Sequence, residues 1–352
     1  MKKYNYKYSK FIRYWLILGL IMLIGQVLLG GITRLTGSGL SITKWDIITG
    51  IIPPLNDQQW QDAFNLYKQT PQYHKINSTF LLTDFKFIYF WEFFHRFWAR
   101  ALGIIFAIPF IILIIRKKID LNLISRLLLV VILSGLTASA GWIMVQSGLV
   151  NRPWVNAYKL TLHFILAVLT IAVMVKIIAD AYLYNNRFNK DQTSFVIILL
   201  IITFIQLLFA GLMSGMKASL FFPTWPSMNG AFIPDVLLIS KNWIWENLTN
   251  YDKHPFAPAL IQFFHRSIAY ILLILIYFYF FKYKNKFYIR ANNWLKLVFI
   301  LVNAQVILGI LTLLKSKGEI PVFLGVTHQL IGLFLFISLL FLYFSLRKKS
   351  KF

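Results

Sequence analysis

The chain has 352 residues, of which 58% are hydrophobic and only 14% are charged, and its formal net charge is +24. This composition excludes an ordinary soluble domain and favours a protein that crosses a membrane several times. The sequence contains no cysteine, which excludes disulfides, iron–sulfur clusters and thiolate metal sites.

Eight apolar segments have the length that a membrane-spanning helix needs, about 20 residues. They occupy residues 14–33, 97–115, 127–150, 160–181, 194–216, 258–281, 297–314 and 322–346. Because Leu, Ile and Phe dominate them without a two-residue alternation, the pattern predicts helices rather than a β-barrel. The predicted fold class is therefore an all-α polytopic membrane protein with eight transmembrane helices.

Basic residues gather in alternate loops between these segments. They cluster at residues 2–13, 116–126, 282–290 and 347–351. By the positive-inside rule, these loops and both termini are predicted to be cytoplasmic. Membrane topology and contact with anionic lipids thus account for the positive charge, and no nucleic-acid partner is expected.

The two halves of the chain resemble each other. Without gaps and at a constant offset, Gln26, Gly31, Trp45 and Pro54 recur as Gln206, Gly211, Trp225 and Pro234. Each copy contains four helices, so both enter the membrane in the same direction, which predicts two parallel-repeat four-helix bundles. The predicted domains are residues 1–184 and 194–352, joined by a cytoplasmic linker at 185–193.

Four histidines occupy corresponding places in the two halves. His95 and His265 lie in the near-identical phrases EFFHR and QFFHR, and all four, with His163 and His328, are predicted to stand near the starts of their helices. The predicted topology puts all four at a similar depth towards the outer face. Two histidines on neighbouring helices can ligate both faces of a heme iron. For any single histidine a hydrogen bond to a backbone carbonyl is the better interpretation, but the symmetric set of four favours two heme sites.

An acid accompanies only the first of the two phrases. Glu92 precedes His95 by three residues and shares its helix face, whereas the second half has Gln262. This difference favours a catalytic base at Glu92 in the first half. An ion pair between Glu92 and Arg96 or Arg100 is the alternative.

Arginines near the same membrane face are candidate partners for heme propionates, because guanidinium pairs well with carboxylate. They are Arg34, Arg96, Arg100, Arg152 and Arg266. Lipid phosphates are an equally weighted alternative. We interpret His74 and His254 as surface loop histidines, Met144 as a packing side chain, and Lys176 and Asp180 as a local ion pair.

Together these motifs resemble those of the heme A synthase family. The residues that carry the resemblance are GGITRLTGSGLS at 30–41, EFFHR at 92–96, GWIMVQSGL at 141–149, FHR at 264–266 and THQ at 327–329. The resemblance covers nearly the whole chain. The long first outer loop and the absence of cysteine look like the branch that mitochondria and related bacteria share.

The resemblance implies that the chain oxidises a ring methyl of heme O to a formyl group, for cytochrome oxidase assembly. Two successive two-electron oxidations would use oxygen from water. His265 and His328 would be the axial ligands of a permanent heme b, His95 and His163 would hold heme O, and Glu92 would be the catalytic acid.

The resemblance also implies partners and a cellular location for the protein. Heme O synthase is an implied partner beside the membrane lipids, and a homo-oligomer is possible. The implied location is a bacterial inner membrane, with the active site towards the periplasmic side.

Two other functions are left open as alternatives. A diheme cytochrome that oxidises quinol also uses histidines on membrane helices, but it usually stacks its hemes near opposite faces. A transporter built from two repeats would have helices broken by Gly or Pro near the midplane, whereas the predicted spans are largely unbroken.

Overall fold

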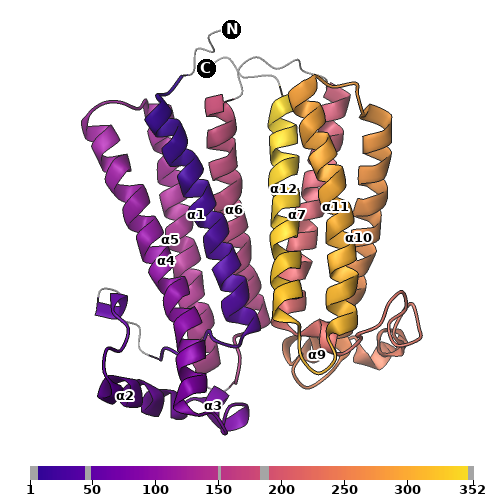
Figure 1. Cartoon of the computed structure of the whole chain (residues 1–352). Coiled ribbons are helices and arrows are strands. Elements are labelled where there is room, and N and C mark those ends of the chain that lie inside the picture. The colour runs from indigo at the N-terminus through magenta and orange to yellow at the C-terminus, as the bar shows by residue number, and fades with distance from the viewer. Residues whose placement is uncertain (1–6, 44–48, 150–151, 183–189, 348–352) are drawn as a thin grey trace. The chain divides into compact units, whose positions relative to one another are not determined.

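The computed structural model describes residues 7–43, 49–149, 152–182 and 190–347 (Figure 1). Within them, eight helices are long and apolar enough to cross a membrane. These are α1 (Lys10–Leu35), α4 (Leu82–Ile115), α5 (Leu121–Leu149), α6 (Ala157–Tyr182), α7 (Lys190–Gly215), α10 (Phe256–Tyr283), α11 (Ile289–Lys315) and α12 (Val322–Leu346). The predicted fold class and number of spans are confirmed.

The chain packs as two compact units. One is Ile21–Ala167, and the other combines Met1–Leu20 with Val168–Phe352, so that α1 and α6 contribute to both. The parallel repeat, the domain limits and the cytoplasmic termini stay predictions. Most of the predicted linker at 185–193 lies outside the described residues, as do Val150 and Trp45.

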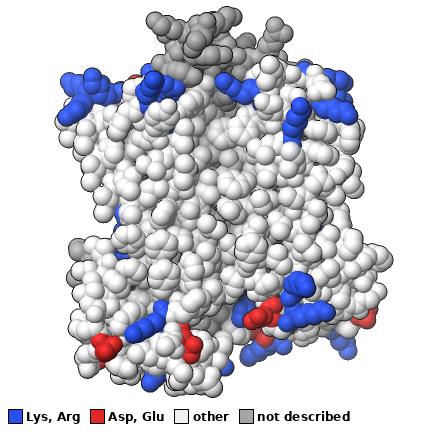
Figure 2. Space-filling view, viewed as in Figure 1, with Lys and Arg blue, Asp and Glu red and all other residues white. Residues whose placement is uncertain are grey.

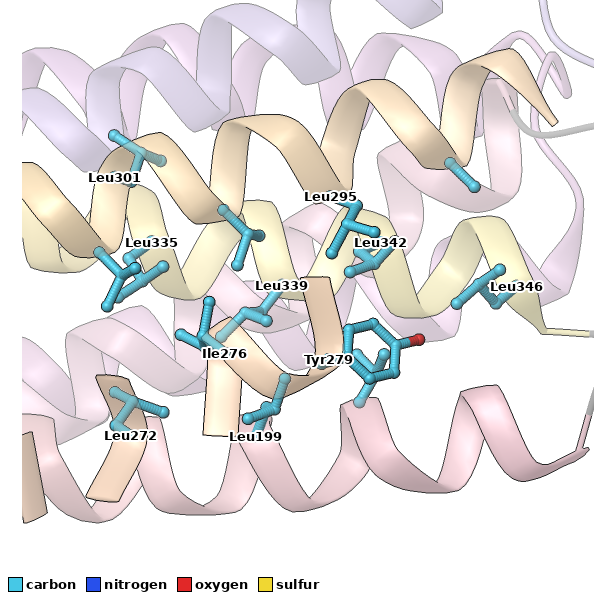
Figure 3. Packing of buried hydrophobic residues seen from close by; sticks show 14 residues of the cluster. Leu199, Leu272, Ile276, Tyr279, Leu295, Leu301, Leu335, Leu339, Leu342 and Leu346 are labelled. Atoms are coloured by element: carbon cyan, nitrogen blue, oxygen red, sulfur yellow. The ribbon is translucent and has the colours of Figure 1, made fainter. Parts of the chain in front are cut away.

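In the second of these units, α7, α10, α11 and α12 lie side by side (Figure 1). Figure 3 shows their apolar side chains meeting at the centre of the bundle, among them Leu199, Ile276, Leu295 and Leu339. Since lipid tails are as apolar as leucine, close packing and polar contacts hold such helices together. One such contact joins Tyr279 Oη to the carbonyl of Gln192 at 3.1 Å.

Helix α4 is longer than the sequence predicts, because it begins at Leu82 and not at Phe97. At 1.5 Å per residue its 34 residues span about 51 Å, whereas the hydrocarbon core of a bilayer is about 30 Å thick. Asp84 accepts a hydrogen bond from the Leu81 backbone N–H at 2.9 Å, which caps the early start. One face of the added turns packs against the outer loop, with Phe85 buried, while Phe87 and Phe90 are more than half exposed.

The two outer segments contain the short helices. After α1 come η1 (Thr49–Ile51), α2 (Asp57–Lys68) and α3 (Pro71–Lys75), and after α7 come η2 (Ala218–Leu220), α8 (Asp235–Leu238), η3 (Ser240–Asn242) and α9 (Trp245–Thr249). Gln72 on α3 donates to the carbonyl of Gly37 at 2.8 Å, which ties the first segment to the end of α1. Gly37 has φ +69°, a conformation that glycine adopts without strain.

Charged side chains lie mainly near the helix ends. Figure 2 shows Lys and Arg gathered there, with a largely uncharged surface between the ends. Lys176 and Asp180, one turn apart on α6, form the predicted ion pair with an N···O distance of 3.1 Å.

Candidate functional site

His265 on α10 and His328 on α12 face each other within one bundle. Their ring centroids are 6.5 Å apart, and their planes make an angle of 72°. Two metal–imidazole bonds of about 2 Å, with half a ring at each end, separate the centroids of two axial imidazoles by about 6 Å. The observed separation therefore fits one iron between the two rings.

Side-chain amides and a glycine surround this pair. The Nε2 of Gln206 on α7 donates to the carbonyl of His265 at 2.9 Å and lies 3.1 Å from the ring Nδ1. The Nε2 of Gln305 on α11 lies 3.4 Å from His328 Nε2. A Cβ atom added at Gly309 would lie 2.9 Å from His328 Cε1, so only glycine leaves room for the ring. An amide N–H donates to the ring nitrogen that carries the lone pair, so these amides mark the nitrogens that a metal would take over.

His95 on α4 and His163 on α6 form the second pair, in the unit Ile21–Ala167. His95 Nε2 would lie 3.4 Å from a Cβ atom added at Gly30 of α1. His163 Nδ1 lies 2.8 Å from the carbonyl of Thr137. A neutral imidazole donates to that carbonyl through Nδ1, which leaves the Nε2 lone pair for a metal. A Cβ atom at Gly141 would lie 2.9 Å from His163 Cε1, as at Gly309 in the other pair.

The histidines do not all stand near the starts of their helices. His163, His265 and His328 are six, nine and six residues into α6, α10 and α12, but His95 is 13 residues into α4. The prediction is wrong for His95, because α4 begins early. The sequence also predicts that all four histidines lie at one depth in the membrane. This depth stays a prediction.

Glu92 is buried, with 3% of its surface exposed, and its carboxylate accepts three hydrogen bonds. Its Oε1 pairs with Arg96 Nη2 at 2.5 Å, and its Oε2 accepts from Ser41 Oγ at 2.7 Å and from the Ile42 N–H at 2.8 Å. The ion pair that the sequence left as the alternative is therefore present. Arg96 also donates to the Ile42 carbonyl at 3.1 Å. The backbone of Ile42 therefore contacts both the carboxylate of Glu92 and the guanidinium of Arg96.

Gln262 takes the place of Glu92 in the other unit, and it donates a hydrogen bond to the backbone where Glu92 accepts one. Gln262 is fully buried, and its Nε2 donates to the carbonyl of Phe222 at 2.8 Å. Arg266 donates to the carbonyls of Pro226 and Ser227, at 2.6 Å and 3.3 Å. The two phrases that differ by one residue in sequence therefore make different contacts.

The other predicted residues lie as follows. Arg34 is in the last turn of α1, Arg100 is near enough to Arg96 for their charges to interact, and Arg152 lies between α5 and α6. Propionate contacts of these arginines, and of Arg96 and Arg266, stay predictions. Met144 packs against the apolar cluster around Leu40, in agreement with its interpretation.

The two loop histidines differ from each other. His74 is exposed on α3. His254 accepts a hydrogen bond from the backbone N–H of Phe256 at 3.2 Å and so satisfies a free donor at the start of α10.

Sequence reasoning missed two kinds of residue at these sites. Ser41 entered only as part of a motif, and Gln206 only as a repeat match. A usable signal for Ser41 was its replacement by Phe221 at the same offset that pairs Gln26 with Gln206. Ser41 and Glu92 are both replaced in the second half, by Phe221 and Gln262. Two positions that change together in this way are candidates for direct contact.

Comparison with known proteins covers almost the entire chain. The family COX15-CtaA, described as cytochrome oxidase assembly protein, matches residues 13–340. A protein named heme A synthase from Flavobacterium johnsoniae is 36% identical over 341 residues, which cover 95% of this chain and 96% of the relative. A protein of the same name from the Wolbachia of Brugia malayi is 34% identical over 359 residues, with 98% and 99% covered.

Proposed function

The chain belongs to the COX15-CtaA family of cytochrome oxidase assembly proteins, and from this premise we propose that it is a heme A synthase. Its reaction would oxidise a ring methyl of heme O to a formyl group. The observation that carries the proposal is the pairing of two similar histidine sites of which only one holds a buried glutamate, Glu92. Neither a quinol-oxidising cytochrome nor a transporter finds support among the relatives.

We assign His265 and His328 to a permanent heme b. The ring separation of 6.5 Å and the room that Gly309 leaves support this assignment. Such a heme supplies a one-electron carrier for the electrons that the substrate loses. Gln206 would hold the backbone of His265 through its carbonyl, and both amides would give up their contacts with the ring nitrogens to the iron.

We assign His95 and His163 to the substrate heme O. The hydrogen bond from His163 Nδ1 to Thr137 supports ligation through Nε2. The substrate methyl would lie near Glu92, and water would supply the oxygen in two successive two-electron oxidations. Each oxidation releases two electrons and two protons, one proton from the C–H bond that breaks and one from the water that adds to the carbon.

Glu92 is the group that would accept such a proton. Ser41 and the Ile42 N–H fix one carboxylate oxygen, and Arg96 fixes the other, so the acid is held in one orientation. These three donors leave one of the roughly four acceptor positions of the carboxylate, on Oε1, to take the proton. We propose that Glu92 both stabilises the electron-poor carbon and takes up the proton.

The chain is a multi-pass membrane protein, and its bacterial relatives suggest an inner membrane. We propose that the site lies towards the periplasmic side, because the basic clusters predict the opposite ends of the helices to be cytoplasmic. We propose heme O synthase as a partner that would deliver the substrate within the bilayer.

The proposal is tested by extracting pigments after co-expression with a heme O synthase. The chain should produce a formyl-bearing heme, and Glu92→Gln should retain heme b but accumulate heme O. Glu319→Gln, at an exposed acid outside the site, is the matched control and should remain active. If the chain makes no formyl heme, the function is wrong; if Glu92→Gln makes as much as the control, Glu92 has no part in it.

The heme b ligands have a separate test. His265→Ala or His328→Ala should abolish the low-spin spectrum of the purified protein. Retention of the full spectrum in both variants would remove these residues as ligands.

A further inference from the structure

An apolar surface covers the outer segment between α7 and α10. Six large side chains of residues 232–245 have between 49% and 76% of their surface exposed. We call them the aromatic loop surface: Phe232, Leu238, Ile239, Trp243, Ile244 and Trp245. So many exposed apolar groups within 14 residues indicate a contact with something apolar.

Internal contacts fix the backbone beneath this surface. Trp243 Nε1 donates to the carbonyl of Leu237 at 2.8 Å, and its ring meets that of Phe256 edge-on at 5.0 Å. Asn242 Nδ2 donates to the carbonyl of Val236 at 2.9 Å. The apolar side chains are therefore presented outward by an ordered fold.

The same segment is continuous with the lipid-facing side of α10. Trp225 Nε1 donates to Tyr270 Oη at 2.9 Å, and both side chains are about two-fifths exposed. Tyr270 belongs to a face of α10 that also exposes Ile274 and Phe278, as expected where a helix meets lipid tails. In Figure 1 the segment extends outward past the end of α10, where lipid would lie.

The first outer segment has a different exterior. Its aromatic side chains point inward, where Phe64, Tyr67 and Phe85 form a buried cluster. The exposed positions of α2 are all polar: Asp57, Gln58, Gln59, Gln61, Asp62 and Asn65. Exposed aliphatic residues of this segment lie outside α2, at Ile51, Ile52, Leu55, Ile76 and Leu81. The helix α2 thus suits water, whereas the aromatic loop surface does not.

We propose that the aromatic loop surface rests in the boundary between headgroups and acyl chains of the adjoining leaflet, with lipid as its partner. Tryptophan is enriched at this depth because its ring is apolar and its N–H is polar. Continuity with the exposed face of α10 favours lipid over a second protein surface. The segment anchors the heme b unit to the bilayer surface, while α2 stands in water.

The absence of native cysteine allows a direct test with single labels. Leu238→Cys and Trp245→Cys, carrying a nitroxide, are compared in phosphatidylcholine–phosphatidylglycerol nanodiscs with Gln61→Cys on α2 and Ile274→Cys on α10. The measured quantity is the ratio of collision with oxygen, which enters lipid, to collision with a water-soluble nickel chelate. The ratio at 238 and 245 should exceed that at 61 severalfold and approach that at 274.

Two results would overturn the proposal. A ratio at 238 and 245 equal to that at 61 means that the surface lies in water. Protection of these positions from both oxygen and the nickel chelate, also in detergent, would mean that protein covers the aromatic loop surface. That protein would be a second copy of the chain or another partner. Both labelled positions are exposed, so that the fold does not depend on either side chain.

Discussion

Replacement of Gly309 by alanine should weaken heme b binding, because the new methyl would occupy space that the His328 ring uses. The added Cβ would lie 2.9 Å from His328 Cε1, a distance at which one of the two groups must shift. Overpacking of this kind costs about 1–3 kcal/mol. At about 1.4 kcal/mol per factor of ten, a cost that falls on the heme-bound state corresponds to a loss of up to roughly 140-fold in heme affinity.

Heme titration into depleted protein measures this affinity, and the low-spin spectrum reports the ligation. Gly135→Ala on α5 is the control, because nothing lies within 4 Å of its added Cβ. Gly141→Ala, whose Cβ would lie 2.9 Å from His163 Cε1, should spare heme b and lower only formyl-heme production. If Gly309→Ala binds heme as tightly as Gly135→Ala and with the same spectrum, His328 is not held by this contact and the argument fails.

Three further predictions concern hydrogen bonds and protons. Ser41→Ala should lower heme A formation about tenfold or more by removing a donor to the Glu92 carboxylate, and Ser41→Thr should restore it; unchanged pigment ratios would refute this. Gln206→Leu should shift the reduction potential of heme b without releasing it, since the amide lies 3.1 Å from His265 Nδ1; an unaltered potential in a redox titration would contradict this. Burial raises the pKa of Tyr67 from 10.0 to about 12, so the folded chain keeps a proton that the unfolded chain loses. The stability that this proton provides is therefore complete below pH 10 and is lost as the pH rises to about 12. In an absorbance titration of tyrosine ionisation, Tyr67→Phe should remove the step near pH 12.

The sequence predicts the helices well because their apolar runs are long, and it predicts their ends less well. The start of α4 illustrates the reason. Residues 82–96 contain Asp84, Lys86, Glu92 and Arg96, so a search for lipid-compatible segments stops at Phe97. The helix continues outward because the cluster around Tyr67 buries its outer turns, and that packing depends on residues that lie far away in the sequence.

The candidate site shows the same division between local and distant contacts. The pair of Glu92 and Arg96 follows from their spacing of four residues on one helix. The contacts of Ser41 and Ile42 with Glu92 join residues about 50 positions apart, and no local pattern predicts them. The packing of Gly309 against His328 likewise requires the positions of two helices relative to each other.

The exchange of glutamate for glutamine changes more than one side chain. Glu92 accepts from the Ile42 N–H, whereas the amide of Gln262 donates to the Phe222 carbonyl, so the backbone contact is reversed. Among the described residues no acid pairs with Arg266, which donates to loop carbonyls, whereas its counterpart Arg96 is paired with Glu92. A positive charge near a heme favours the reduced state, in which the iron carries less positive charge. We propose that the exchange of Glu92 for Gln262 therefore suits the first site to hold an acid and the second to hold a reducible heme.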